Sequence, residues 1–235
     1  MIHDLHSHTY YSFCGRDDPH AVCEAAIRGG IELLGISDHN YGIGHARYKA
    51  YLSELHALRE EYRGRLKILV GIEICTLPCP ITPPSPDWLL PEGEDLSDFD
   101  YCLIEHLDLP DSYLGADLFS LTDRLSTRAG IAHTDLFGFC QARGWDPLRY
   151  LSSLAERDIF WEMNVNYDSI HHHRLHPYVI RFLEDEAQQA IVRQSGIALS
   201  VGFDSHRAEE YDAERVKRMH AFLEEHGIRR VSFDQ

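Results

Sequence analysis

Short apolar runs alternate along the chain with longer stretches in which apolar residues recur every three or four positions. The short runs have the length and composition of strands that are buried on both faces. We expect strands at residues 2–6, 33–37, 66–74, 101–106, 130–133, 159–164 and 198–203. The longer stretches have the period of amphipathic helices. The hydrophobic pattern therefore predicts strands and helices that follow one another in turn.

Start and stop signals mark several of these helices. Asp18 and Pro19 predict the beginning of a helix that Gly29 and Gly30 end. Gly64 follows a second helical stretch over residues 47–63 and predicts its end. We expect further helices at residues 117–128, 146–157, 177–195 and 209–225, and a last short run at 229–233.

The alternation predicts the fold class. Successive strands joined by helices pair in parallel through right-handed crossovers, and an α/β barrel is the natural closure for seven such units. The length suits one barrel domain over residues 1–235. Six prolines between residues 76 and 97 interrupt the alternation. Because so many prolines cannot sit in a strand ladder, we expect a surface excursion there, as a lid or rim.

Polar side chains gather where the predicted strands end. The carboxyl ends of parallel barrel strands meet at one rim, which is where the active sites of such barrels lie. The residues at these positions are His6, His8, Asp38, His39, Glu73, His106, His133, Asn164, Asp204 and His206. The sequence therefore predicts that imidazoles and carboxylates from seven strand ends share one cavity.

Several of these residues have an ordinary structural alternative. His6 and His8 fit either a metal site or a polar strand end, and residues 37–40 fit a helix cap as well as a ligand. His106 and His133, each taken alone, fit core histidines that bond to the backbone.

Glu73 is a stronger indication of a metal site, because it lies inside an apolar run. A buried carboxylate is costly unless a cation compensates it, and a metal ion is a simpler answer than an arginine partner. Asp204 and His206 repeat the two-residue spacing of His6 and His8 with mixed donors. Imidazole with carboxylate suits Zn²⁺, Mn²⁺ or Fe²⁺ better than Ca²⁺ or Mg²⁺.

Composition narrows the function classes. The chain has 22 Lys+Arg and 38 Asp+Glu, and its net charge of −16 argues against binding a nucleic acid through its phosphates. The 16 histidines are more than packing requires. Without a run of about 18 apolar residues or a signal-like beginning, we expect a cytoplasmic protein and no membrane partner. The six cysteines lack the spacing of a disulfide scaffold, so we expect free thiols.

An ordered set of motifs carries a family resemblance. The segments are DLHSHT (4–9), GISDHN (35–40), GIEI (71–74), EH (105–106), IAHTD (131–135), EMN (162–164) and GFDSH (202–206). With them the chain resembles a stand-alone member of the polymerase and histidinol phosphatase (PHP) superfamily of metal-dependent phosphoesterases. The resemblance implies a distorted, TIM-like (β/α)7 barrel with two to three divalent ions, Zn²⁺, Mn²⁺ or Fe²⁺, at the carboxyl-terminal rim.

The resemblance also implies a ligand set. A first metal would be held by His6, His8, Glu73 and Asp204; Glu73 would bridge to a second, completed by His106 and His133; and His39 and His206 would belong to a third. The chain departs from the family at the remaining ligand of the third metal, where Cys14 stands in place of a His or Asp. A thiolate is a competent zinc ligand, and the alternative is that Asp17 or Asp18 takes that place.

The activity implied is hydrolysis of a small phosphate monoester by a metal-activated water, and histidinol phosphate is one candidate substrate. The alternatives are a phosphodiesterase or nuclease, and a PHP module that binds metal without catalysis. Arg207, Arg16 and Arg174 lie beside the motifs and are candidates for contacts with the substrate phosphate. Asp38 would orient a ligand or accept a proton. The histidines of residues 171–176 fit either a border of the substrate site or a solvated loop, and we favour the loop.

Overall fold

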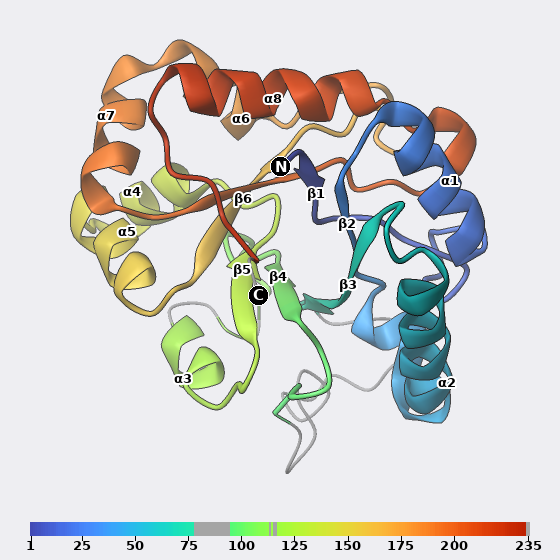
Figure 1. The fold of residues 1–235 in the computed structure, drawn as a ribbon. Coiled ribbons are helices and arrows are strands. Elements are labelled where there is room, and N and C mark those ends of the chain that lie inside the picture. Colours follow the sequence, from blue (N-terminus) through green and yellow to red (C-terminus); the bar gives the residue numbers. More distant parts are fainter. Residues whose placement is uncertain (78–94, 113, 115–116, 234–235) are drawn as a thin grey trace.

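Seven parallel strands form the centre of the part of the chain that the structure, a computed structural model, describes: residues 1–77, 95–112, 114 and 117–233 (Figure 1). The strands are β1 (His3–Asp4), β2 (Leu33–Ile36), β3 (Lys67–Cys75), β4 (Tyr101–Glu105), β5 (Arg128–Ile131), β6 (Phe160–Asn164) and β7 (Leu199–Gly202). Each strand pairs in parallel with the next one along the chain. Every predicted strand is present.

The first and last strands close the sheet into a barrel. The Leu5 amide donates to the Val201 carbonyl at 3.0 Å, and a parallel bridge joins Ser7 to Ser205. The fold is therefore a TIM-like α/β barrel of seven strands, as the sequence predicts. Because β1 and β7 are neighbours, the two ends of the chain's motif series come together at one rim.

Helices surround the strands (Figure 1). They are α1 (Pro19–Gly29), α2 (Asn40–Glu61), α3 (Leu118–Thr122), α4 (Leu136–Arg143), α5 (Pro147–Glu156), α6 (Pro177–Glu184), α7 (Glu186–Ser195) and α8 (Ala213–Glu225). The expected start and stop of α1 are confirmed: the Asp18 carboxylate accepts from the Ala21 amide at 2.9 Å, and Gly30 ends the helix at φ 73°.

Some helix boundaries differ from the prediction. The stretch 177–195 is two helices, because Asp185 leaves helical geometry (φ −108°, ψ 96°) and its carboxylate caps α7. The helix expected at 117–128 is the short α3, and Arg128 already belongs to β5. α2 starts earlier than expected, at Asn40, with a kink at Gly44. α4 is not among the predicted helices.

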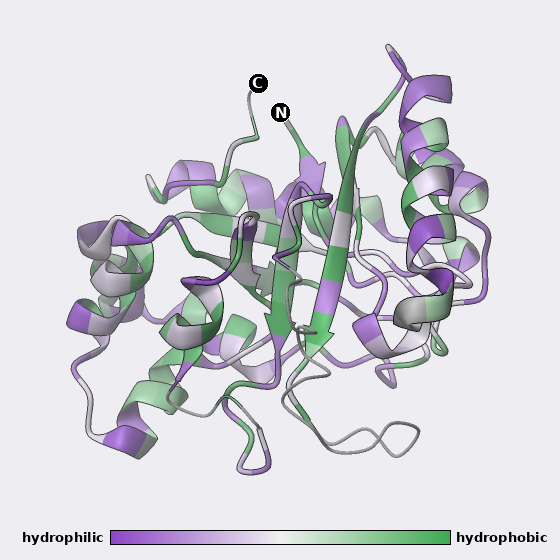
Figure 2. Ribbon diagram, turned by 90° about the horizontal axis from the view of Figure 1, so that it is seen from below, coloured by the Kyte–Doolittle hydropathy of each residue, from purple (hydrophilic) through white to green (hydrophobic). Residues whose placement is uncertain are grey.

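The hydrophobic core has two layers, one inside the barrel and one between the strands and helices. The inner layer contains Leu5, Leu33, Leu69, Tyr101, Leu103, Ala132 and Phe160. The Tyr101 hydroxyl donates to the Leu5 carbonyl at 2.7 Å, across the barrel interior. Figure 2 shows mostly hydrophobic strands at the centre and hydrophilic residues on the helices around them. The strands therefore form a packed scaffold, and several of its buried polar residues, such as Glu73 and Glu105, lie at or near the carboxyl ends of the strands.

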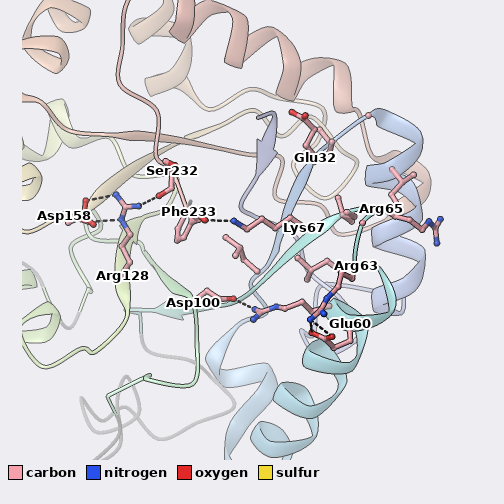
Figure 3. Close-up of a pocket in the computed structure, with 18 residues that line it drawn as sticks. Glu32, Glu60, Arg63, Arg65, Lys67, Asp100, Arg128, Asp158, Ser232 and Phe233 are labelled. Carbon is pink, nitrogen blue, oxygen red and sulfur yellow. Dashed lines mark hydrogen bonds and ion pairs between the residues drawn. The ribbon is translucent and has the colours of Figure 1, made fainter. Parts of the chain in front are cut away.

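A pocket of about 1100 Å³ lies at the end of the barrel where the strands begin (Figure 3). Its lining includes Lys67 at the start of β3, Asp100 just before β4 and Arg128 at the start of β5. Arg128 contacts Asp158 and the Ser232 carbonyl, and the Lys67 ammonium donates to the carbonyl of Phe233.

Most of the proline-rich excursion expected at 76–97 lies outside the described residues. Of its ends, Thr76 is buried and donates its hydroxyl to the Glu105 carbonyl at 2.7 Å. The described cysteines, Cys14, Cys23, Cys75, Cys102 and Cys140, are free thiols, as expected. None of the helices in the described part of the chain is long and apolar enough to cross a membrane. A cytoplasmic location and a single domain over 1–235 stay predictions.

Candidate metal centre

Four buried side chains from three strand ends meet at the carboxyl-terminal rim. The Nε2 atoms of His6 and His8 lie 3.2 Å apart. Both face Asp204 Oδ1, at 3.6 Å from His6 and 3.0 Å from His8. Both also face Glu73, whose Oε1 is 3.2 Å from His6 and whose Oε2 is 3.4 Å from His8. We call these four residues the first group.

The spacing of the first group fits a bound cation. Donors that sit 2.0–2.2 Å from one ion are about 3–3.6 Å apart in octahedral or tetrahedral coordination. Within the described residues, the ion pairs of Glu73 and Asp204 are with histidines alone, so the arginine alternative for Glu73 has no support. Glu73 Oε2 is buried and makes no hydrogen bond of good geometry. These residues could therefore hold a divalent metal ion.

A second group adjoins the first through Glu73. His133 Nε2 lies 3.0 Å from Glu73 Oε1, and the rings of His133 and His106 are 5.4 Å apart. Glu105, which sequence reasoning left without a role, belongs here too: its Oε2 is 2.7 Å from His106 Nε2. Two features of the sequence mark Glu105: it is a carboxylate at the end of an apolar strand, as Glu73 is, and it is the first residue of the EH segment (105–106).

A third group contains the cysteine that departs from the family pattern. Donor atoms of His8, Cys14 and His39 lie within 4.8 Å of one another, as do those of His8, Asp204 and His206. Burial would raise the pKa of the Cys14 thiol, but hydrogen bonds with His206 and His39 lower it to about 6. A thiol of this kind is a competent zinc ligand.

The aspartates offered as alternatives to Cys14 have other partners. Asp18 caps α1, and Asp17 accepts a hydrogen bond from the Ala208 amide at 2.7 Å. Their contacts therefore favour Cys14 as the remaining donor of the third group.

The imidazoles and carboxylates of the candidate centre shift one another's pKa values. Burial opposes charge on His133, but its hydrogen bond with Glu73 raises its pKa to about 9. Burial likewise opposes charge on His206, and the neighbouring Asp204 raises its pKa to about 10. The pKa of Glu73 is well below its usual value, because His6 and His39 outweigh its burial. Metal ions would replace these protons, since metal-bound histidine is neutral at the donor nitrogen.

The backbone is strained at three of the candidate ligands. His106, His133 and Asp204 have φ values of 64°, 24° and 55°, in the region that residues other than glycine rarely adopt. Each follows directly on an apolar strand or comes within two residues of its end. Strain of this kind is retained where it places functional side chains.

A buried carboxylate behind the centre orients the ligands. Glu162 Oε1 is 2.7 Å from His6 Nδ1, and Glu162 Oε2 accepts from the His133 amide at 2.9 Å. Gly202 makes room for this contact, because a Cβ atom there would lie 1.9 Å from Glu162 Oε1 and 2.7 Å from the His6 Cβ. A hydrogen-bonded carboxylate behind a metal-binding histidine fixes its tautomer and ring orientation.

Two histidines of the loop after β6 lie closer to the centre than expected. His171 Nε2 is 3.4 Å from Asp204 Oδ2, and the ring of His176 stacks on that of His133 at 5.7 Å. The buried Asp168 joins this layer, with its oxygens 3.0 Å from His171 Nδ1 and 3.2 Å from His206 Nδ1. By contrast, His172 and His173 are exposed, as the solvated-loop interpretation predicts.

Asp38 lies beneath the centre and organises the loop that carries Cys14. Its carboxylate accepts hydrogen bonds from the amide and hydroxyl groups of Thr9 and Ser12, at 2.6 to 3.0 Å. The Ser12 hydroxyl in turn lies 3.1 Å from His8 Nδ1. These contacts favour the orienting role expected for Asp38 over that of a proton acceptor.

The three candidate arginines differ in their surroundings. Arg207 pairs with Glu210 at 3.7 Å, and its Nε is buried without a hydrogen-bond partner. Arg16 and Arg174 are exposed, although the Arg16 amide bonds to the His206 carbonyl at 3.3 Å. Arg207 is therefore the arginine with an unsatisfied donor beside the centre.

The fold is an α/β barrel with a cluster of histidines and carboxylates at its carboxyl-terminal rim that could bind metal ions. A family model described as the PHP domain matches residues 4–178, which is well over half of the chain. The chain belongs to the PHP-domain family. The match ends before Asp204 and His206, so the inclusion of these two residues rests on their place in the structure.

Solved structures share the fold at low sequence identity. Histidinol phosphate phosphatase from Lactococcus lactis, complexed with zinc, L-histidinol and phosphate, aligns with a TM-score of 0.63 and 16% identity, covering 98% of this chain and 95% of the other. A structure of the metal-dependent tyrosine phosphatases YwqE from Bacillus subtilis and CpsB from Streptococcus pneumoniae aligns with a TM-score of 0.56 and 20% identity, covering 95% and 87%. Among proteins with curated descriptions, none matches this sequence.

Proposed function

We propose that the protein is a metal-dependent phosphoesterase that hydrolyses a small phosphate monoester. One observation supports this above the others: the donors of the first group, His6, His8, Glu73 and Asp204, face one another at 3.0–3.6 Å without a lysine or arginine partner among the described residues. Membership in the PHP family and the phosphatases that share the fold agree with the proposal. Histidinol phosphate is one candidate substrate.

The candidate ligands would form up to three metal sites. The first group would hold one ion, Glu73 with His106 and His133 a second, and Cys14 with His39 and His206 a third, Zn²⁺, Mn²⁺ or Fe²⁺ in each case. Divalent ions so placed polarise a phosphoryl group and make water a better nucleophile.

Other side chains would orient the ligands and the substrate. Glu162 holds the His6 ring in place, and Asp38 fixes the loop of Cys14. The guanidinium of Arg207, which follows His206, would donate to a phosphate oxygen, and the exposed Arg16 and Arg174 would add charge at the mouth.

Metal-loaded protein tested on two substrates decides the proposal. The protein is stripped with a chelator, reloaded separately with Mn²⁺, Zn²⁺ or Fe²⁺, and assayed with p-nitrophenyl phosphate and bis-p-nitrophenyl phosphate. We expect metal-dependent release of nitrophenol from the monoester in preference. Preference for the diester would favour a phosphodiesterase, and no turnover of either by protein with bound metal would favour a non-catalytic module.

A further inference from the structure

A column of stacked rings leads from the candidate metal centre to the protein surface. Inside the centre, the ring of His8 lies 4.8 Å from that of His206 and 4.6 Å from that of His39. Tyr41 continues the column at 4.6 Å from His39, and Phe13 ends it at 6.1 Å from Tyr41. No successive pair of these rings is tilted by more than 26°. The five residues form one continuous wall, which we call the ring column.

The ring column changes from buried to exposed along its length. His8, His39 and His206 are buried, and Tyr41 is partly buried. Phe13 is 63% exposed, more than any other large hydrophobic side chain among the described residues. Isolated hydrophobic residues are common on protein surfaces, but stacked rings join this one to the centre. The exposed ring of Phe13 therefore offers apolar surface to a molecule that is bound at the rim.

Contacts on both sides of Phe13 fix the loop that carries it. Before it, the Ser12 hydroxyl donates to the Asp38 carboxylate at 2.6 Å; after it, the Cys14 thiol hydrogen-bonds with two histidines of the third group. Gly42 lets α2 approach this loop closely, since a Cβ atom there would lie 2.6 Å from one of the loop's backbone carbonyl oxygens. The position of Phe13 is thus set before any ligand binds, which lowers the entropy cost of binding.

The place of Phe13 suits the leaving group of a phosphate monoester. Ions at the rim would hold the phosphoryl group, so the rest of the substrate would extend from the rim toward the mouth. Phe13 lies two rings outward from His39, on the flank of the third group. An aromatic ring prefers aromatic partners, which it contacts by offset stacking or edge to face. Sites for small molecules are lined in the same way, by aromatic side chains with a few polar groups.

We propose that Phe13 determines substrate specificity by stacking with a planar, aromatic leaving group of the phosphate monoester. The proposal rests on the function proposed above, because that function takes the rim as the place of the phosphoryl group. A purely structural role is the alternative: Phe13 would then only shield Tyr41 and Cys14 from water. Its loss would in that case alter metal binding and leave the choice between ligands unchanged.

Binding of non-hydrolysable phosphonates tests the proposal without an assay of activity. Full-length protein reloaded with Mn²⁺ is titrated calorimetrically with benzylphosphonate, cyclohexylmethylphosphonate and ethylphosphonate, which present the same charged group to the ions. We expect benzylphosphonate to bind at least about fivefold more tightly than cyclohexylmethylphosphonate, because only the aromatic ring gains by stacking. Ethylphosphonate, which has no ring, should bind more weakly than both.

Matched variants assign this preference to the ring of Phe13. Phe13→Leu keeps an apolar side chain without a ring, so the benzyl and cyclohexylmethyl compounds should bind within about twofold of one another. Phe13→Tyr keeps the ring and should retain the preference of the wild type. Trp145→Leu is the control, because Trp145 is also exposed (37%) but packs against Phe139 and Tyr150; it should bind all three compounds as the wild type does. The metal content of each variant is measured alongside.

Equal affinity of the wild type for the benzyl and cyclohexylmethyl compounds would overturn the proposal, and so would a failure to bind any of the three. An undiminished preference in Phe13→Leu would contradict it as well. A loss of bound metal in Phe13→Leu that weakens all three phosphonates equally would establish the structural alternative instead. Preferential binding of benzylphosphonate by a protein that hydrolyses neither nitrophenyl ester would contradict the proposed function alone and leave Phe13 as the aromatic contact.

Discussion

The carboxylates at the two ends of the barrel have different kinds of partner. Where the strands begin, Arg128 pairs with Asp158 and Arg63 with Glu60, both at 2.6 Å, so the lining of the pocket is largely self-neutralising (Figure 3). Where the strands end, Glu73 faces only histidines among its described ion-pair partners. The charges of a surface ion pair already compensate one another, whereas a buried carboxylate surrounded by imidazoles is compensated only by protons on the rings or by metal ions.

The difference shows why net charge is a poor guide to the ligand of this protein. The chain carries −16 overall, yet its candidate site would take an anionic phosphate ester. Attraction for that anion would come from bound ions at the rim rather than from the arginines at the opposite end. Removal of the ions should therefore abolish binding of the substrate.

The largest effect is expected from Glu73→Ala. This carboxylate contacts His6, His8 and His133, so its loss should empty both the first and the second group. Elemental analysis of protein reloaded with Zn²⁺ or Mn²⁺ should show a fall of about two equivalents, and phosphatase activity should drop by more than about 100-fold. Full metal occupancy would refute a bridging role for Glu73.

A carboxylate at the other end provides the control for this experiment. Glu60→Ala removes an exposed partner of Arg63 beside the pocket. Metal content and activity should match those of the wild type, because this end of the barrel contributes no donor to the centre.

The next largest effect is expected in stability, which should depend on pH in opposite directions at the two ends of the barrel. At the beginning of β1, burial lowers the pKa of His3 well below its usual value and that of His220 to about 4. Groups that are neutral in the folded state stabilise it above their unfolded pKa of about 6.5, and this stability is lost as the pH falls through the folded pKa. In urea unfolding of metal-free protein, the free energy of unfolding should fall on the order of 2 kcal/mol between pH 6.5 and 4. The His220→Gln variant should show a smaller fall over the same range.

At the carboxyl-terminal rim, the pH dependence of the free energy of unfolding has the opposite sign. In metal-free protein the raised pKa values of His133, about 9, and His206, about 10, stabilise the folded state below pH 6.5. This contribution is lost as the pH rises through 9 to 10. Reloading with Zn²⁺ should abolish the alkaline loss, and an unchanged alkaline limb would show that the ions do not bind these histidines.

The fold followed from the sequence because strands buried on both faces are continuous apolar runs, which stand out in any chain. α4 did not, because it is short, has Gly138 in its first turn and begins three residues after His133. The split between α6 and α7 depends on one capping side chain, that of Asp185, inside a stretch with uninterrupted helical spacing.

The site followed from the sequence only where a motif marked it. Asp168 belongs to no motif, and the EH segment indicated His106 rather than Glu105 as a ligand. Both carboxylates lie at the centre because a neighbouring strand or loop brings imidazoles within 3.3 Å of them. His171 reaches Asp204 through a loop with left-handed residues at His172 and His173, both at φ 53°. A hydrophobic pattern does not encode a path of that kind.

A smaller effect is expected from Cys14→Ala, and it is confined to one flank of the rim. Loss of the thiol should lower the metal content by at most one equivalent and leave the first group filled, because Cys14 contacts His39 and His206. Replacing Zn²⁺ by Co²⁺ adds a direct readout, since a thiolate ligand gives a sulfur-to-cobalt charge-transfer band in the near ultraviolet. Unchanged stoichiometry and no such band in the wild type would mean that Cys14 is not a ligand.

The smallest effect is expected from Arg63→Ala at the opposite end. The Arg63 side chain is 75% exposed and pairs with Glu60 three residues earlier. Pairs of this kind contribute about 0–1 kcal/mol, so the midpoint of urea unfolding should hardly move. A larger shift would show that the charges around the pocket are coupled more tightly than their exposure indicates.

The contact between His8 and Asp204 spans 196 residues of sequence, and this separation orders events during synthesis. One edge of β1 stays open until β7 folds onto it, because the Leu5 amide donates its hydrogen bond to the Val201 carbonyl. Since a ribosome releases the amino-terminal strands first, a nascent chain carries most of the candidate donors before it can assemble them. The complete first group can therefore form only after the last strand has emerged, so an ion that needs all four of these donors would bind late in synthesis or after it.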